Sequence, residues 1–363
     1  MKVIVAYASC GSGHTKAAEA LYGYLKEHRK DVQVQLIDIL DTTPYLFRLV
    51  YRQGYFFLVN HALFLWRFGF WFTKTGFLRS FSRRIGALIN RPFTKRFTRM
   101  LISQKPDYCI ATHFLVAEIA AGVKKRYDTG LRVFNVITDF EVHPFWISQG
   151  IDRYFVASEL TKKRTLRFGV PERLIQVSGI PAEEKFLSAY DKKTLRAKYG
   201  IAPGAFCVFM TTGSFGVGPL EELVRLLQPH AHVLVGCAHN KALCRKLERD
   251  KWPNVRVFGF VNYVHELLAI TDALVTKPGG LTITESLLMR IPFFFSMAIP
   301  GQEEGNIAVL KEYGLSGGIQ KPHEIITSIL RLKNDPQLSA RLKEIMSQIR
   351  KPDAAKVICD AIR

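Results

Sequence analysis

Short apolar runs alternate along most of the chain with stretches in which apolar residues recur at helical spacing. The first run covers Met1–Ser9, and a helical stretch follows it over Thr15–Glu27. Apolar runs reading DYCIAT, RVFNVITDF and FCVFMTT continue the series. Strands that alternate with helices in this way are typical of a parallel sheet covered by helices on both faces. The pattern therefore predicts the α/β class.

The alternation starts twice, and the two series are joined near a proline-containing segment, IQVSGIPAEEKF. We therefore predict two Rossmann-like, doubly wound domains that face a central cleft. The N-terminal domain is expected over residues 1–172 and the C-terminal domain over residues 173–345. A last helix over residues 346–363 is expected to pack back on the N-terminal domain. The length of 363 residues suits two domains of ordinary size.

A glycine turn follows the first strand of each series, at Gly11–His14 and at Gly213–Gly218. Glycines let backbone N–H groups approach a ligand closely, and the start of a helix favours negative charge. Neither turn is a Walker A motif or a complete GxGxxG motif. Because ligands of open α/β sheets bind beyond the carboxyl ends of strands, the two turns predict one anion-binding cleft with two lobes.

The segment Ile270–Asn306 combines a third glycine turn, KPGG, with the acidic residue Glu285 and the polar motif PGQEEGN. Its KPGG sequence is expected to end a strand and open a helix, which Thr282 or a neighbour caps and in whose first turn Glu285 lies. Glu285 suits either the helix dipole or the diol of a ribose. The later PGQEEGN is either a surface turn or a turn whose polar side chains bind sugar hydroxyls.

Residues 45–105 differ from the rest because they hold twelve Lys or Arg, many aromatic residues and no Asp or Glu. Such a mixture is typical of a segment that lies on an anionic membrane; a helical insertion with a solvated basic face is the other interpretation. The apolar stretch Tyr55–Phe72 has about the length of a membrane span, but Asn60, His61 and Arg67 interrupt it. We expect it to lie on the membrane surface.

The net charge and the cysteines bear on the binding partner and on the cellular compartment of the protein. The net charge of +20 favours a polyanionic partner, which includes nucleic acid, but no nucleic-acid-binding motif accompanies it. The six cysteines form no CxxC pair and are expected to be reduced residues of a core. No cleavable signal peptide is evident at the N-terminus. We therefore expect a peripheral protein of the cytoplasmic face of a membrane, with no nucleic-acid partner.

Taken together, the motifs resemble those of one enzyme family. KPGGLTITES with PGQEEGN, GSGHTKAAEAL, ITDFEVHPFW and VSGIPAEEKF occur here in the order of the monogalactosyldiacylglycerol synthase and processive diacylglycerol glucosyltransferase family. That family is related to the peptidoglycan enzyme that adds N-acetylglucosamine to lipid I. The resemblance implies a GT-B fold and inverting transfer of galactose or glucose from UDP-galactose or UDP-glucose to diacylglycerol. It also implies that no metal or other cofactor is required.

The resemblance further assigns residues to the donor. The pyrophosphate would meet the turn of the second series, the nucleotide would be bordered by two short segments, Glu285 would bind ribose, and the PGQEEGN residues would bind the hexose. The donor-binding residues expected in this way are Gly213, Ser214, Phe215, Gly216, Asn240, Phe258, Gly259, Phe260, Val261, Pro278, Gly279, Gly280, Thr282, Glu285, Gln302, Glu303 and Asn306.

The transfer requires a base that takes the proton of the acceptor hydroxyl. His14 is the first choice, because it follows the first glycine turn, titrates near neutrality and matches a functional histidine of the family. Asp139 is either the rival base or the group that orients His14. Residues expected at the acceptor or at the membrane are Gly11, Gly13, His143, Trp146, Arg67, Trp66, Trp71, Arg83 and Arg84.

Two alternatives remain open from the sequence. The first is a UDP-N-acetylglucosamine transferase that acts on a polyprenyl-linked acceptor, since it would share the donor half. The second belongs to another class, a basic nucleic-acid-binding protein.

Overall fold

The computed structural model describes residues 1–62, 64, 65, 67, 69, 90–213 and 218–363, which form two compact units. The first unit contains Met1–Glu183, Ile299–Gly305 and Lys351–Arg363, and the second contains Glu184–Ala298 and Asn306–Arg350. The first boundary between the two units therefore follows Glu183, whereas the sequence predicted a domain boundary after residue 172. Trp66, Trp71, Arg83, Arg84 and the turn residues Ser214, Phe215 and Gly216 lie outside the described residues.

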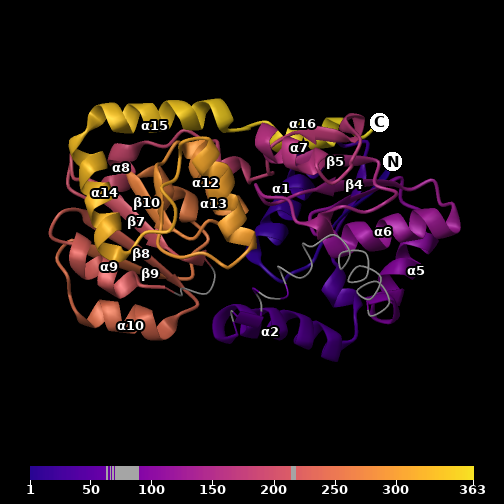
Figure 1. Ribbon diagram of the computed structural model, residues 1–363, viewed down its shortest axis with the longest axis horizontal. Helices are drawn as coiled ribbons and strands as arrows, with labels where there is room; N and C mark the ends of the chain where they lie inside the picture. Colours follow the sequence, from indigo (N-terminus) through magenta and orange to yellow (C-terminus); the bar gives the residue numbers. More distant parts are fainter. Residues whose placement is uncertain (63, 66, 68, 70–89, 214–217) are drawn as a thin grey trace. The chain divides into compact units, whose positions relative to one another are not determined.

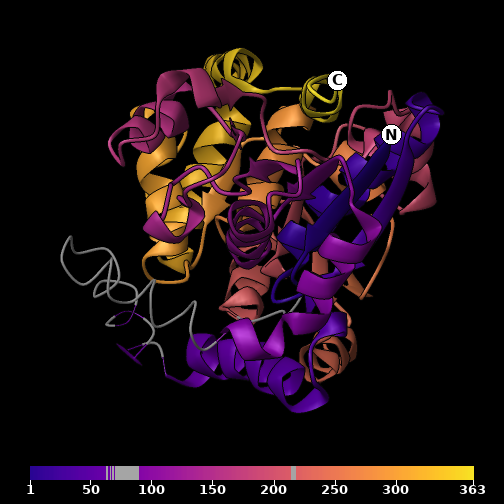
Figure 2. The same ribbon diagram turned by 90° about the vertical axis from the view of Figure 1, so that its right-hand side faces the viewer.

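The first unit is built on a parallel sheet in the order β2-β1-β3-β4-β5-β6. Figure 1 shows its helices, and in Figure 2 the strands stand side by side with the N-terminus above and α2 below. The strands are β1 (Lys2–Tyr7), β2 (Gln33–Asp38), β3 (Tyr108–Ala111), β4 (Arg132–Val136), β5 (Arg153–Val156) and β6 (Ile175–Val177). The helices are α1 (Ser12–His28), α2 (Tyr45–His61), α5 (Lys95–Gln104), α6 (Phe114–Tyr127), α7 (Glu159–Leu166) and α16 (Ala354–Asp360).

The second unit is built on a parallel sheet in the order β11-β10-β7-β8-β9. Its strands are β7 (Cys207–Thr211), β8 (His232–Ala238), β9 (Val255–Gly259), β10 (Ala273–Thr276) and β11 (Phe293–Phe295). Its helices are α8 (Lys192–Lys198), α9 (Leu220–Leu227), α10 (Lys241–Arg249), α11 (Val264–Ala269), α12 (Gly280–Met289), α14 (Pro322–Asn334) and α15 (Pro336–Ile349). Helix α13 (Gln302–Glu312) begins in the segment assigned to the first unit and continues in the second.

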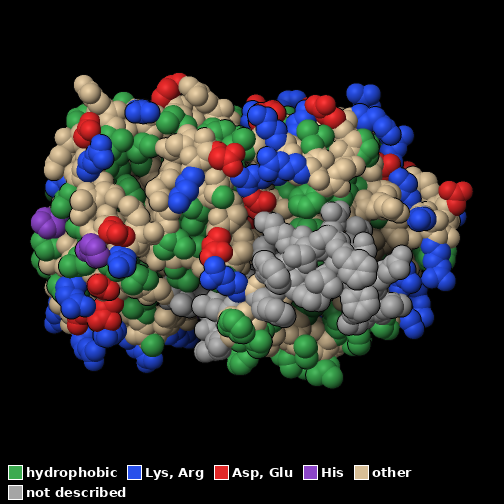
Figure 3. Space-filling view, viewed as in Figure 1, with side chains coloured by type: hydrophobic (Ala, Val, Ile, Leu, Met, Phe, Trp, Pro, Cys, Tyr) green, Lys and Arg blue, Asp and Glu red, His purple; other side chains and the backbone are tan. Residues whose placement is uncertain are grey.

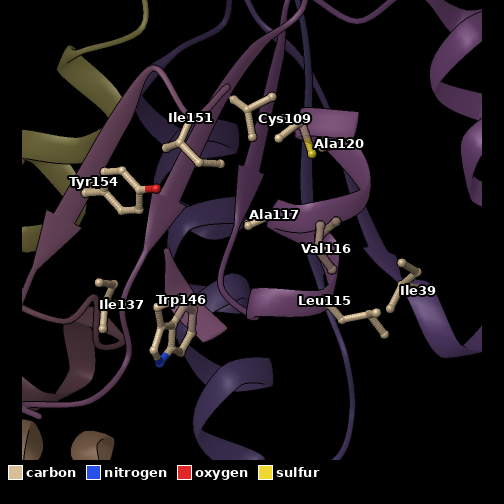
Figure 4. Packing of buried hydrophobic residues seen from close by; sticks show 14 of the residues in the cluster. Ile39, Cys109, Leu115, Val116, Ala117, Ala120, Ile137, Trp146, Ile151 and Tyr154 are labelled. Carbon is tan, nitrogen blue, oxygen red and sulfur yellow. The ribbon is translucent and has the colours of Figure 1, made fainter. Parts of the chain in front are cut away.

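Both faces of the first sheet are buried, which explains why its strands read as continuous apolar runs. In β1, Val3 and Val5 pack with α1 and α16, while Ile4 and Ala6 point to the opposite face and pack in the cluster that includes α6. Figure 4 shows the second of these clusters, in which Leu115, Val116, Ala117 and Ala120 of α6 lie together with Cys109 of β3. The alternation along each strand thus anchors helices on both sides of the sheet.

Two details of the first turn differ from the expectations from the sequence. The strand is Lys2–Tyr7, and the helix begins at Ser12, three residues before the predicted start at Thr15. Gly11 is the extended N-cap residue, with φ −168°, so Gly13 already belongs to the first helical turn. The glycine weakened the helical pattern of the sequence, but tertiary packing of α1 outweighs its low helix propensity.

Candidate active site

A pocket of about 460 Å³ lies in the first unit, where the ends of β1, β3 and β4 meet helix α2. The residues that line it come from five separate parts of the chain. They are Cys10, Gly11, His14, Tyr51, Leu58, Leu65, Gly69, His113, Phe114, Asp139, Glu141, His143, Phe145, Trp146 and Gln302. Most of this surface is apolar, and the titratable groups His14, Asp139 and Glu141 are set into it.

His14 stands in the first turn of α1, half-buried, and contacts the ends of two neighbouring strands. Its Nδ1 lies 2.9 Å from the carbonyl oxygen of Thr112 and 2.8 Å from the hydroxyl oxygen of Thr138. Because a carbonyl oxygen only accepts hydrogen bonds, Nδ1 carries the proton, and the lone pair is on Nε2. Thr112 also donates its hydroxyl to the carbonyl of His14 at 2.9 Å, so the two segments hold each other.

The surroundings of His14 favour its neutral form. Burial lowers the pKa of His14 to about 4, while the hydrogen bond to the Thr112 carbonyl opposes this shift. At neutral pH the imidazole is therefore uncharged, with Nε2 able to accept a proton. Thr112 and Thr138 were not predicted from the sequence, although both are polar residues just after buried strands: Thr112 directly follows β3, and Thr138 lies two residues after β4.

His113 supports the site as a helix cap. Its Nδ1 accepts the N–H of Leu115 at 3.1 Å at the start of α6, so its proton is on Nε2, which lies 3.5 Å from the sulfur of Cys10. Its ring stands edge-on to that of His14, with centroids 4.7 Å apart. Burial and the neighbouring His14 hold the pKa of His113 well below its usual value. Burial also raises the pKa of the Cys10 thiol to about 12, which disfavours a thiolate.

Asp139 and Gln302 lie side by side, although the sequence predicted different roles for them: Asp139 at the base and Gln302 at the hexose of the donor. The Asp139 carboxylate is buried and accepts a hydrogen bond of 2.8 Å from the Nε2 of Gln302. Both side chains line the pocket that His14 lines. A residue expected to bind the hexose of the donor therefore lies in the same pocket wall as the expected base.

Two buried contacts near Gln302 fix the start of α13. Glu303 is 3% exposed, and its carboxylate accepts the N–H of Ile299 at 2.7 Å. A Cβ at Gly305 would come 2.5 Å from Cγ of Glu141, so only glycine allows this approach. Glu141 forms an ion pair with Arg164, and both side chains are largely buried. Periodicity could not have pointed to Glu141, because it lies in an irregular segment.

His143 and Trp146 occupy the turn after β4. His143 accepts the N–H of Phe145 through its Nδ1 at 3.3 Å. Trp146 is 3% exposed, its ring centroid lies 5.9 Å from that of His14, and its carbonyl accepts the side-chain amide of Asn135 at 2.7 Å. Both residues line the pocket, so the structure brings the two expected acceptor residues together with His14.

Most of the described residues that were expected to bind the donor lie in the second unit. Helix α12 begins at Gly280 after the extended N-cap Gly279, which has no side chain to accept from the first N–H groups of the helix. The prediction that Thr282 or a neighbour caps this helix with its side chain is therefore wrong, and Glu285 lies beyond the first turn because the helix starts earlier than expected. Asn306 is fully buried, and its amide donates to the carbonyl of Pro278 at 3.0 Å, which fixes the turn before α12.

The residues expected to border the nucleotide lie at the ends of β8 and β9. Asn240 caps α10 by accepting the N–H of Leu243 at 3.0 Å. Phe260 is 67% exposed and stacks on His239, with ring centroids 4.6 Å apart and an interplanar angle of 12°. Phe258 and Gly259 end β9, and Val261 follows as a half-buried residue. An exposed aromatic pair of this kind suits the face of a planar base.

Helix α2 presents apolar side chains to solvent while its other side is anchored in the first unit. Arg52 donates to the buried carboxylate of Asp38 at 2.9 Å and to the Ser9 hydroxyl. Figure 3 shows hydrophobic side chains gathered over this helix. Among the described residues of the stretch 45–67, the exposed large hydrophobic ones are Tyr45, Leu46, Leu49, Val50, Phe57, Phe64 and Leu65, and Arg67 is exposed as well. No helix within the described ranges has the length and apolar character to cross a bilayer.

Comparisons with known proteins agree on one family at the level of sequence. A family model described as monogalactosyldiacylglycerol (MGDG) synthase matches residues 14–182. A processive diacylglycerol beta-glucosyltransferase of Bacillus cereus is 30% identical over 374 residues, which cover 99% of this chain and 93% of that protein. The enzyme of the same name from Bacillus cytotoxicus is 28% identical over 376 residues, with the same coverage of 99% and 93%.

Solved structures agree on the fold. The crystal structure of MurG from Acinetobacter baumannii has a TM-score of 0.63 at 16% identity and covers 99% of each chain. A UDP-GlcNAc 2-epimerase from Neisseria meningitidis, bound to UDP-GlcNAc, has a TM-score of 0.61 at 16% identity and covers 100% of this chain and 99% of that one. The GT-B architecture of two Rossmann-like sheets, expected from the sequence, is thereby confirmed.

Proposed function

Since this chain belongs to the family of monogalactosyldiacylglycerol synthases and processive diacylglycerol beta-glucosyltransferases, we propose that it transfers a hexose from a UDP-sugar to the free hydroxyl of diacylglycerol. We propose glucose as the sugar, because the relatives that match over the full chain carry that name, with galactose as the competing donor. The product is a glycosyldiacylglycerol, formed with inversion at the anomeric carbon.

The observation that carries this proposal is the state of His14 in the pocket. Its Nδ1–H donates to the Thr112 carbonyl, so the neutral ring keeps a lone pair on Nε2 beside an apolar surface. In the proposed step Nε2 takes the proton of the acceptor hydroxyl as its oxygen bonds to the anomeric carbon. The bond from that carbon to the UDP oxygen breaks at the same time, and UDP leaves with the bonding electron pair.

The donor is proposed to bind through the second unit. Phe260 and its neighbours at the end of β9 border the base, Glu285 binds the ribose, and the Gly213 turn and the start of α12 meet the diphosphate. Backbone N–H groups at a helix start stabilise the charge that grows on the leaving diphosphate. For this reason we expect transfer without a metal ion or other cofactor. Among the proposed hexose ligands, Gln302 lines the pocket, whereas Glu303 and Asn306 hold the backbone around it.

The acceptor is proposed to enter from a membrane. The pocket wall includes Tyr51 and Leu58 of α2 and the nearby Leu65, and the exposed residues Leu46, Val50 and Phe57 continue the apolar surface on that helix. Apolar side chains at the acyl boundary together with basic residues at anionic headgroups allow peripheral, reversible binding. We therefore propose that the enzyme works on the cytoplasmic face of a membrane whose anionic lipids attract residues 45–105.

The central experiment measures product formation on liposomes. The protein is incubated with anionic vesicles that contain diacylglycerol and, in parallel, with UDP-glucose, UDP-galactose or UDP-N-acetylglucosamine, and the lipids are separated by thin-layer chromatography. A glucosyl-diacylglycerol is expected. A galactosyl product alone would correct the sugar. Transfer of N-acetylglucosamine to a polyprenyl-linked lipid, with no product from diacylglycerol, would refute the proposed acceptor.

Membrane binding is tested separately by vesicle flotation. Leu46→Ser with Phe57→Ser is expected to reduce the fraction bound to anionic vesicles severalfold, because two exposed apolar side chains of α2 are lost. Leu226→Ser is the matched control, since Leu226 is an exposed residue of α9 in the second unit. Equal flotation of the α2 variant and the control would contradict a membrane role for α2.

A further inference from the structure

Three polar residues follow neighbouring strands of the second sheet. Strands β11, β10 and β7 lie next to one another, and the residues directly after them are Ser296, Lys277 and Thr212. Because the strands are parallel, their carboxyl ends meet at one edge of the sheet. That edge is where open α/β sheets bind ligands. None of these three residues is among the donor-binding residues expected from the sequence.

Lys277 reaches across to the turn after β7. A Cβ at Gly213 would lie 2.8 Å from Cε of Lys277 and 3.9 Å from its Nζ, and Gly213 has a φ of +76°. The lysine stem therefore lies directly against the backbone of the turn, at a place that only glycine leaves open. Lys277 is half-buried, so its ammonium group is partly shielded from water.

Two buried hydroxyl groups stand at the same edge. Thr212 is 2% exposed and Ser296 is 8% exposed, and neither side-chain oxygen has a hydrogen-bond partner within the part of the chain that the structure describes. Buried hydroxyls are normally paired, and leaving them unpaired costs free energy. A Cβ at Gly218, whose φ is +130°, would lie 3.3 Å from Cγ2 of Thr212 and 3.0 Å from the sulfur of Met297. Thr212 and Met297, which follows Ser296, are thus both close neighbours of Gly218.

The start of α12 adds backbone donors beside Lys277. Its N-cap Gly279 provides no side chain to the first N–H groups of the helix, and the preceding turn is fixed by the bond from Asn306 to the Pro278 carbonyl. A helix start attracts anions through these N–H groups. A cation, two hydroxyl donors and a helix start together match the chemistry of a diphosphate.

We propose that Lys277, Thr212 and Ser296 form an anion cradle that holds the diphosphate of a nucleoside diphosphate sugar. Lys277 supplies the charge, and the two hydroxyls donate hydrogen bonds to phosphate oxygens. This inference rests on the proposed function for the identity of the donor, and it adds the residues that neutralise the donor's charge. The same lysine balances the negative charge that UDP gains when its bond to the sugar breaks.

The test compares the binding of UDP, UMP and uridine by calorimetry, without acceptor lipid. Lys277→Met keeps the apolar stem and removes the charge, so it is expected to weaken UDP binding roughly 10- to 100-fold and to leave uridine binding unchanged. Lys277→Arg is expected to restore most of the affinity for UDP. Thr212→Val and Ser296→Ala are each expected to weaken UDP binding about threefold to tenfold, again without effect on uridine.

Lys246→Met is the matched control, because Lys246 is a half-exposed lysine of α10 that pairs with Glu221. The cradle is overturned if Lys277→Met leaves UDP binding unchanged, or if it weakens uridine as much as UDP. A wild-type protein that binds no uridine nucleotide would overturn both the donor and the cradle. A protein that binds UDP through Lys277 but glycosylates no diacylglycerol would refute the proposed acceptor alone.

Discussion

Two regions are built in opposite ways: the pocket around His14, and the carboxyl ends of β7, β10 and β11 in the second unit, where the donor is proposed to bind and which we call the donor edge. The pocket collects residues from five parts of the chain, from Cys10 to Gln302, and its groups His14 and Asp139 are held by partners from other parts. The donor edge instead consists largely of one stretch, Ala273–Asn306, in which β10, a turn and α12 follow each other directly. A contiguous motif carries its geometry with it, whereas a dispersed pocket depends on the whole sheet.

The largest effect is expected in the pocket. His14→Ala removes the proposed base, so turnover should fall about 100- to 10,000-fold, while the affinity for UDP should stay within about twofold, because the residues proposed to bind the nucleotide belong to the second unit. Steady-state kinetics and calorimetry with UDP measure the two quantities. His28→Ala, on the exposed end of α1, is the control and should keep full turnover. Loss of UDP binding equal to the loss of turnover would remove His14 from the proposed role.

The pH dependence of stability sharpens the same comparison. The pKa of His14 is near 4 in the folded protein and near 6.5 when unfolded, so the unfolded state binds more protons between these values. The contribution of His14 to the free energy of unfolding is therefore fully present above about pH 6.5. It falls by roughly 2–3 kcal/mol as the pH drops toward about 4. Urea unfolding at pH 7, 5.5 and 4 measures it. His14→Ala should flatten the slope, although His113 keeps a part of it. An unchanged slope in this variant would contradict the lowered pKa.

At the donor edge, Glu285→Ala should act on binding before chemistry. We expect roughly tenfold weaker binding of UDP, because a carboxylate that accepts two ribose hydroxyls is lost, and a smaller change in turnover. Glu222→Ala on α9 is the control, since Glu222 is an exposed acid of the same unit. An equal affinity of both variants for UDP would place Glu285 outside the ribose site.

The smallest effect concerns the bond between Asp139 and Gln302. A double-mutant cycle with Asp139→Ala and Gln302→Ala should give a coupling of about 1 kcal/mol in unfolding free energy. If Gln302 contacts the hexose, the effects of the two substitutions on the KM for the donor should also be non-additive. A cycle of Asp139→Ala with Lys26→Ala, an exposed residue of α1, should be additive. Additivity of the first pair would show that the hydrogen bond contributes nothing to stability.

The sequence alone determined the class of the protein and most of its elements. Alternating apolar runs predicted two series of parallel strands, because strands buried on both faces must be apolar throughout. The order of the glycine turns and of KPGG and PGQEEGN was enough to identify the family. His14, Asp139, Trp146 and Gln302 were also predicted from the sequence, since they lie in GSGHTKAAEAL, ITDFEVHPFW and PGQEEGN, and all four line one pocket.

The tertiary structure decided which of these residues meet. Only the parallel order β1, β3, β4 brings Thr112 and Thr138 to His14, and this contact sets the tautomer of the ring and the burial that lowers its pKa. The tertiary structure also pairs Asp139 with Gln302 and places the side chain of Lys277 next to Gly213. A linear pattern records which side chains face the interior, but hydrogen bonds and desolvation act over a few ångströms. Those distances exist only once strands far apart in the chain lie side by side.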